Sequence, residues 1–361
     1  MAFRLLQSIF SGASQPGKFD KELMLRGIER VVDGTDPRLR AVSHYRRKLW
    51  EPVERAIDFV VKFVNDLPPA IVADRQGYMT DPRLRALFAS PDSLRETLSF
   101  SDGTRNYLKQ APDPLPAELY AGLGAVRVEK NVLGIEMDGE ILRRDVPQTV
   151  VNFCDHRLVF LNDNEQDTRR ELMRRAADYL IETALQRLTA SRVQKTQLEQ
   201  QQRKLLLQKA NLLKKAQVGF ESLAGSATSK PVDLAALERQ LEEIETELNQ
   251  LRADTATLDK HLAKVAATLS EPEKYLRRES VSLTLDHTNT KVPADSPRVA
   301  NSMSFQDIVM GKDRRVTALF VRFPSGELLP RDFHCEIPVQ REEQAQAAAA
   351  ILKDEVYKRF P

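Results

Sequence analysis

The chain has 361 residues, with 54 Lys or Arg against 52 Asp or Glu, so its formal net charge is only +2. A balance this close gives no overall field toward nucleic acid, and two cysteines are too few for a disulfide framework. No apolar run reaches the roughly 18 residues of a membrane-spanning helix, and the N-terminal residues lack the pattern of a secretory signal. We therefore expect a cytoplasmic protein of two or three domains.

The first segment, residues 1–110, is expected to form a helical lobe that stands apart from the rest or packs on it. Apolar residues at 39–64 recur on one helical stripe, which Pro52 is expected to kink or split. The heptapeptide TDPRLRA occurs at 35–41 and at 80–86, and in each copy Thr or Asp can cap a helix that starts at the Pro. Similarity stops there, so we interpret the copies as two capped helices, with a true repeat as the alternative.

One motif near the N-terminus resembles a nucleotide site without fitting it. Residues 12–18 match the GxxxxGK spacing of a phosphate-binding loop, but Phe19 stands where a Ser or Thr hydroxyl should hold magnesium. Pro16 also removes a backbone N–H that would bind phosphate. We interpret the segment as a turn, so nucleotide hydrolysis is disfavoured, while docking of these residues on the protein or on a membrane surface stays open.

Strand-like sequence flanks the middle of the chain. After a proline-rich linker at 111–116, short β-rich runs at 117–165 include a two-residue turn signal at Asp138-Gly139. Alternating β character returns at 280–286 and 315–323, within a second segment at 273–340, and an Ala-rich helix is predicted at 341–361. The sequence therefore predicts two β-containing segments separated by a long insertion.

That insertion, residues 166–272, carries the strongest pattern in the chain. Apolar residues at 234–269 alternate in steps of three and four with Thr255 as the one polar layer, and the same steps run through 177–219. The pattern predicts an antiparallel coiled-coil hairpin with its loop at 219–231. Because a hairpin returns to its base, we expect a predominantly helical α+β fold with a small discontinuous α+β head, interrupted by the hairpin.

Charges beside the apolar steps predict how the two helices pair. In the antiparallel register Arg192 lies beside Asp259 and Glu199 lies beside Arg252, so the signs swap on both helices together. Parallel pairing of the long helices between subunits is the alternative.

Some leucines on the first helix of the hairpin lie outside its apolar seam. Together with one aromatic residue near the loop they form the candidate partner-binding surface: Leu206, Leu207, Leu213 and Phe220. We therefore expect a non-enzymatic interaction or scaffold protein that docks a protein partner or self-associates through the hairpin. Packing of these leucines within the chain is the simpler alternative.

Clusters of basic residues give a second hypothesis, a nucleic-acid-associated protein. The candidates are Arg46, Arg47 and Lys48 near the N-terminus, with Arg174 and Arg175 at the root of the hairpin. No aromatic series accompanies them that could stack on bases, and nearby acidic residues offset much of their charge.

Zinc is the one cofactor that the sequence suggests. Cys154 and His156 are two residues apart, a spacing that shares one strand face, and His334 and Cys335 lie in the other half of the expected head. The alternative is a buried Cys154 with ordinary surface histidines. No recognisable catalytic motif is present, so whether the protein is an enzyme is left open, with the balance against it.

Overall fold

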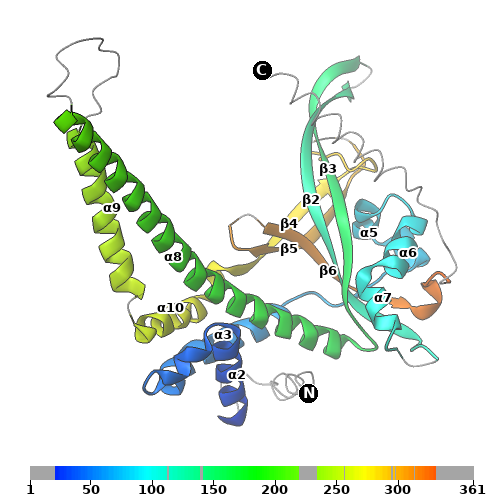
Figure 1. The fold of residues 1–361 in the computed structure, drawn as a ribbon. Helices are drawn as coiled ribbons and strands as arrows, with labels where there is room; N and C mark the ends of the chain where they lie inside the picture. Colours follow the sequence, from blue (N-terminus) through cyan, green and yellow to red (C-terminus); the bar gives the residue numbers. More distant parts are fainter. Residues whose placement is uncertain are drawn as a thin grey trace.

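The computed structural model describes residues 21–330, with gaps at 112–113, 139–140, 219–233, 256, 294–295, 297 and 313. The side chains of 136–142, 212–218, 234–235 and 251–255 also lie outside the description. The protein is a mixed helix-and-sheet structure in which a long helical arm and a sheet diverge from a common base (Figure 1). Among the helices that are described, none is both long enough and apolar enough to cross a membrane.

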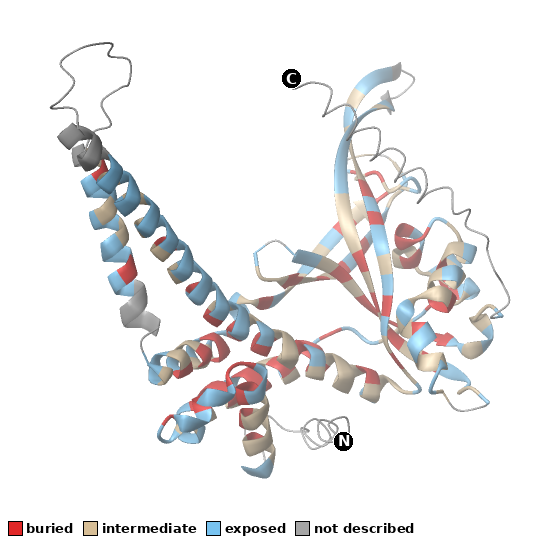
Figure 2. Ribbon diagram, viewed as in Figure 1, coloured by how far each residue is buried: buried red, intermediate tan, exposed pale blue. Residues whose placement is uncertain are grey.

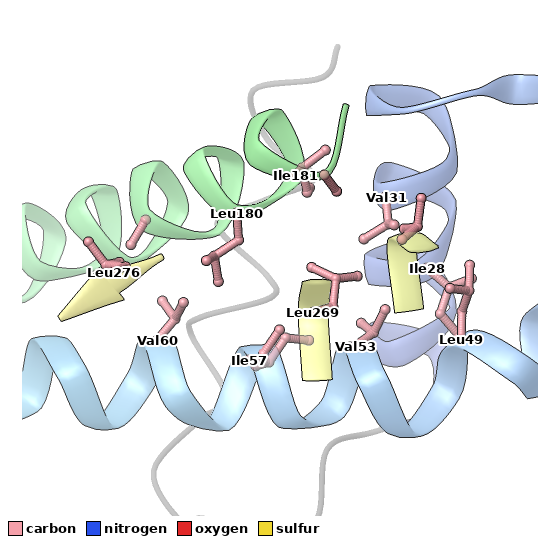
Figure 3. Close-up of a cluster of buried hydrophobic side chains, with 14 of the residues drawn as sticks. Ile28, Val31, Leu49, Val53, Ile57, Val60, Leu180, Ile181, Leu269 and Leu276 are labelled. Atoms are coloured by element: carbon pink, nitrogen blue, oxygen red, sulfur yellow. The ribbon is translucent and has the colours of Figure 1, made fainter. Parts of the chain in front are cut away.

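The base is a cluster of helices drawn from distant parts of the chain. It is formed by α2 (Lys21–Gly34), α3 (Tyr45–Asn65), the first part of α8 (Glu165–Val218) and α10 (Leu258–Ser270). Each helix turns an apolar stripe inward, and Figure 3 shows Ile28, Val53, Ile57, Leu180 and Leu269 pointing toward one another. Pro52 lies inside α3 without ending it, so the predicted stripe is largely right but begins in a separate short helix.

That short helix is η1 (Pro37–Ala41), and it belongs to the first copy of the repeated heptapeptide. Asp36 caps it by accepting a hydrogen bond from the backbone of Arg38, and Asp81 caps α5 (Pro82–Leu87) through Arg83 in the same way. In both copies the arginine side chain also returns to the capping carboxylate. The two copies are therefore two locally similar helix starts, as the sequence indicated.

Beyond the base, α8 continues outward with α9 (Leu234–Thr255) beside it, the two running in opposite directions (Figure 1). Leu198 of α8 and Leu237 and Leu248 of α9 are buried in this outer part. Lys209 Nζ of α8 lies 2.7 Å from Glu238 Oε1 of α9, an ion pair across the two helices.

The returning chain is not one helix, which corrects the sequence-based expectation. It breaks after Thr255, the predicted polar layer, and Thr257 then caps α10 by accepting a hydrogen bond from the Lys260 backbone. A threonine with extended backbone is a good helix start, so a local signal interrupts the long apolar pattern.

The predicted pair between Arg192 and Asp259 is also wrong. Arg192 Nη2 lies 2.9 Å from Asp36 Oδ2, and Asp259 Oδ1 accepts instead from Lys48 Nζ at 2.6 Å. Asp36, the partner of Arg192, and Lys48, the partner of Asp259, both come from the N-terminal region. They reach these positions because η1 and α3 pack beside α8 and α10. The side chain of Arg252 lies outside the description, so its predicted pairing stays a prediction.

The sheet joins strands from both sides of the helical insertion. Its order is β3 (Ile141–Asn162), β2 (Glu118–Asp138), β6 (Arg314–Pro324), β5 (Asn301–Met310) and β4 (Leu276–Leu285). Neighbours along this path are antiparallel, while the two-residue β1 (Ile71–Val72) pairs with β6 in parallel. Short helices η3 (Pro272–Lys274) and η4 (Ser325–Glu327) flank β4 and β6.

The β runs predicted at 117–165 proved to be parts of two long strands, β2 and β3. They pair as far as Asp138 and Ile141, the residues on either side of the predicted turn. The outer part of this β2–β3 hairpin extends beyond the rest of the sheet (Figure 1). Strand β5 was not predicted, because its alternation of polar and apolar residues is interrupted by an inward-facing charge, Asp307.

One face of the sheet is covered by α4 (Arg75–Thr80), α5, α6 (Pro91–Phe100) and α7 (Asp102–Leu108), as Figure 2 shows by its buried residues. Gly103 of α7 fits closely here, since a Cβ at this position would lie 2.2 Å from the Leu158 carbonyl oxygen.

The structure divides the segment predicted as an N-terminal helical lobe, residues 1–110, between two cores. Within its described part, α2 and α3 belong to the helical base, while α4 to α7 belong to the core under the sheet. The division falls at the Pro68-Pro69 segment and β1, where the chain crosses from one core to the other. The predicted C-terminal helix at 341–361 lies outside the described residues.

Candidate functional site

The outer arm exposes two of the leucines that the sequence singled out. Leu206 is 50% exposed and Leu207 is 65% exposed, whereas Leu198 nearby on the same helix is buried. The side chain of Leu213, and Phe220 altogether, lie outside the description. The visible part of the candidate surface is therefore an apolar pair on the solvent side of α8.

The charges around this pair differ between the two helices of the arm. On α8, residues 195–211 include four basic side chains and one acidic one, while on α9 residues 236–250 include five acidic side chains and one basic one. The acidic residues of α9 are exposed. The arm thus combines a mainly basic helix, which carries the exposed leucines, with a mainly acidic one.

The basic residues proposed for nucleic acid are mostly engaged within the protein. Arg46 Nη2 lies 2.9 Å from Glu29 Oε1, and Lys48 is paired with Asp259. Arg174 is paired with Glu171 one turn earlier in α8. Arg47 and Arg175 form no ion pair with the described residues, but they lie on different helices, at two separate pockets. The structure therefore leaves no continuous basic strip among these five residues.

The proposed zinc ligands can be placed only in part. Cys154 is exposed and its thiol faces the Val126 carbonyl oxygen at 3.5 Å. His156 is half-buried and stacks on Phe88, with 4.6 Å between ring centroids. Asp155 between them has φ 53°, and β3 shifts register against β2 here, so the alternation expected to place both ligands on one face is interrupted.

Burial lowers the pKa of His156, and contact with the Leu87 backbone and the Asp155 charge oppose that shift. Its environment is that of a ring packed under α5. No group of three or more metal-binding side chains occurs within the described ranges. His334 and Cys335 lie outside those ranges, so the four-residue site stays a prediction.

A buried carboxylate that the sequence did not single out lies in the sheet. The Asp307 side chain is fully buried, and it accepts hydrogen bonds from Arg127 Nη2 at 2.7 Å and from Thr317 Oγ1 at 2.8 Å. Arg315 approaches it at 3.4 Å. With both oxygens satisfied by neighbours on β2 and β6, Asp307 has the surroundings of a structural anchor rather than of an acid or base.

A cleft of about 470 Å³ lies between the sheet and the root of α8. Its floor is the sheet face opposite α4 to α7. There Gly122 and Gly124 of β2 pair with Phe320 and Ala318 of β6, so three small residues on adjacent strands form a shallow trough. Strand β2 also shifts register against β3 on both sides of these glycines, which further opens the sheet at this place.

The remaining walls of the cleft are apolar. Phe63 and Leu67 at the end of α3, Ile308 and Met310 of β5, and Tyr179 of α8 all line it. The Tyr179 hydroxyl reaches the β5–β6 turn, where a Cβ at Gly311 would lie 3.6 Å from it. Gly311 has φ +66°, a conformation that glycine adopts without strain.

One arginine holds the walls together. Arg169 of α8 donates to the carbonyl oxygens of Val64 and Leu67 at 2.8 and 3.2 Å, so it closes the C-terminal end of α3. Its guanidinium also lies 4.7 Å from the centre of the Phe320 ring on β6. One side chain therefore joins α3, α8 and the sheet next to Leu67 and Phe320, which line the cleft.

The rim of the cleft carries more arginine than acid. Its charged residues are Arg83, Arg157, Arg175, Arg314 and Arg315, with Asp155 and Glu182. Arg83 pairs with Asp81, Arg157 with Asp155, and Arg315 with Glu279. Arg175 and Arg314 form no ion pair within the described part of the chain, and both are exposed.

Of the charged residues at the rim of the cleft, only Arg175 was a candidate from the sequence, and the ligand considered there was nucleic acid. The available signal was the run LYAGLGAV in β2, because glycines inside a strand weaken it and often mark close approach of another group. The pairing of that run with Ala318, about two hundred residues later, could not be inferred from the spacing along the chain.

Comparisons with protein-family models, with curated proteins and with solved structures each found no match.

Proposed function

We propose that this protein is a non-enzymatic interaction protein that associates with a second copy of itself through the α8–α9 arm, which we take to be an antiparallel coiled coil. The observation that carries the proposal is the pair Leu206 and Leu207, exposed on a helix on which the seam residues Leu188 and Leu198 are buried. Covering a leucine fully is worth about 1.5–3 kcal/mol, and a two-fold interface would use each exposed pair twice.

A second copy is favoured as the occupant by charge. The exposed edge of α9 is acidic and that of α8 is basic, so two arms related by a two-fold axis can place each acidic edge against the partner's basic edge. Exposed charges of this kind contribute little energy but select register and orientation. The association should therefore weaken as salt increases.

The test is sedimentation of the full chain over a range of micromolar concentrations. The wild type is expected to form a dimer or higher oligomer, and the double change Leu206→Asp with Leu207→Asp is expected to leave a monomer. Both positions are exposed, so the melting temperature should stay near that of the wild type.

The matched control is Gln208→Asp, which adds a negative charge at an exposed position of the same helical turn without removing a leucine. It should sediment like the wild type. A wild type that is monomeric at every concentration, or an oligomer that persists in the double variant, would show that the arm does not carry self-association.

A further inference from the structure

We propose that the cleft between the sheet and the root of α8 binds a small amphiphile with one anionic head and an apolar body, of the kind represented by a medium-chain carboxylate. The proposal is independent of arm self-association, because the cleft lies at the base of α8 rather than at Leu206 and Leu207. It uses residues that the sequence-based function did not account for.

The size and lining of the cleft fit such a ligand. Sites for small molecules commonly enclose roughly 300–1,000 Å³ and are mostly apolar with a few polar groups, and this cleft has about 470 Å³. Ile308, Met310 and Val316 are only half-buried along its floor. An apolar chain lying over Gly122 and Gly124 would cover them without displacing a side chain.

The two glycines support occupation of the trough. A Cβ at Gly124 would meet Val316 Cγ1 at 3.2 Å, and a Cβ at Gly122 would meet Val159 Cγ2 at 3.4 Å. Larger residues at these positions would fill the trough from below and press on the neighbouring strands. Glycine inside a strand costs about 0.5–1 kcal/mol relative to alanine, and close approach of a ligand is one of the situations in which strands contain it.

The rim specifies the charge of the head group. Arg175 stands on the α8 wall and Arg314 on the sheet wall, and neither forms an ion pair with the described residues. Of the two acidic residues at the rim, Asp155 already accepts from Arg157 at 2.8 Å, which leaves Glu182 to oppose the arginines. A guanidinium binds a carboxylate or phosphate through two parallel hydrogen bonds, so a single anionic head is the complementary group.

The experiment is calorimetric titration of the full chain with dodecanoate below its micellar concentration, with dodecanol as the uncharged probe and dodecyl phosphate as a second anion. Dodecanoate should bind and raise the melting temperature, while dodecanol should bind at least about tenfold more weakly, a difference of ~1.4 kcal/mol. Dodecyl phosphate that binds more tightly than dodecanoate would assign the head to phosphate; equal binding of all three probes would overturn the anionic head.

Two variants test the site itself. Arg175→Gln with Arg314→Gln should weaken dodecanoate binding about tenfold or more without changing dodecanol binding, because only the head loses its partners. Ala318→Phe should abolish binding of all probes by filling the trough. The control for the arginines is Arg55→Gln with Arg105→Gln, which removes the same charge from exposed positions outside the cleft.

The outcomes separate the two proposals. The double variant at Leu206 and Leu207 should bind dodecanoate as the wild type does, whether or not the arm self-associates. Failure of dodecanoate to bind the wild type, or unchanged affinity in the Arg175 and Arg314 double variant, would overturn the cleft proposal. Because those two arginines are exposed and form no ion pair with the residues that the structure describes, their loss should leave the fold intact, which circular dichroism would verify.

Discussion

The inner part of α8, which lies in the base, and its outer half have the same apolar spacing. The two parts differ in how many other helices cover them. At the base, α2, α3 and α10 surround the helix, and Leu180 and Val265 are at most 1% exposed. In the outer half α9 lies beside it, and much of the helix is exposed (Figure 2). Leu206 and Leu207 are among the exposed residues. The same helical repeat therefore yields a multi-helix core at one end and a helix pair at the other.

The difference shows what an apolar repeat determines. It specifies that a helix has a face to be covered, but the number of helices that cover it depends on which other segments reach it. At the base, α3 is held against α10 by apolar contacts, and α2 is held to α8 by an ion pair between Arg30 and Asp178 at 2.6 Å. The following predictions test this contrast, beginning with the largest effect.

Truncation at the base should destabilise the whole protein. Leu269 is buried among α2, α3 and α8 (Figure 3). It also lines a small, half-open void of about 50 Å³. Leu269→Ala should lower the free energy of unfolding by about 2–5 kcal/mol, because it removes buried methyl groups and enlarges the void. Urea unfolding measures the loss.

The control for that change is Leu185→Ala on the exposed side of α8, where the side chain is 37% exposed. It should cost less than about 1 kcal/mol. A base variant that loses no more than this control would mean that the helices of the base do not form one cooperative core.

Truncation in the outer half should act locally. Leu248 of α9 is fully buried, and Leu248→Ala should lower the free energy of opening α9 by ~2–4 kcal/mol while changing global unfolding less than Leu269→Ala does. Hydrogen exchange of α9 amides should therefore accelerate while amides of α3 stay protected. Leu207→Ala, at an exposed position, should leave exchange of α9 unchanged. Equal acceleration in α3 and α9 would show that arm and base open together.

The two heptapeptide copies allow the loss of a helix cap at the base to be compared with the loss of a cap in the sheet core, with a smaller expected effect on stability. Asp36 caps η1 and accepts from both Arg38 and Arg192, whereas Asp81 caps α5 with Arg83 as its arginine partner. Asp36→Ala should cost about 1–2 kcal/mol, more than Asp81→Ala, because it also frees the contact between η1 and α8. Thermal unfolding of the two variants under identical conditions decides this; a larger loss at Asp81 would contradict it.

The smallest predicted effect is a pH dependence of the base. Burial lowers the pKa of His261, the positive charges of Arg192, Arg38 and Lys264 add to the shift, and Asp36 opposes it. The folded base therefore favours the neutral imidazole. Since the unfolded chain keeps the ordinary pKa of about 6.5, this contribution to stability is complete above that pH and is lost as pH falls through the lower folded pKa.

His261→Gln should accordingly flatten the decline in melting temperature below neutral pH. His156, under α5, has a pKa lowered by burial in the same direction, so His156→Gln serves as the counterpart in the sheet core. A pH profile that neither change alters would rule out both imidazoles as the source.

Much of the secondary structure could be predicted, because it rests on local signals. The stripe from Leu39 to Val64, the caps at Asp36 and Asp81 and the β character of residues 117–165 are all readable over a few turns or strand lengths. The coiled-coil nature of the arm stays a prediction. Strand β5 escaped prediction because its buried Asp307 is stabilised by Arg127, Thr317 and Arg315, which all lie on other strands.

The candidate sites divide in the same way. Leu206 and Leu207 could be singled out because their positions relative to the seam follow from helical geometry alone. The cleft could not, since Gly124, Ala318 and Arg175 come from three distant segments whose approach depends on strand register and on the docking of α8.

By itself, the sequence determined the mixed helix-and-sheet content, the helix starts and the apolar faces that require partners, because those depend on neighbours a few residues away. Only the tertiary structure decided which partners cover each face. The N-terminal helices are divided between two cores. Arg192 forms its ion pair with Asp36 instead of Asp259, and Leu207 stays exposed. Such choices depend on contacts between segments far apart in the chain, whose energies no local pattern records.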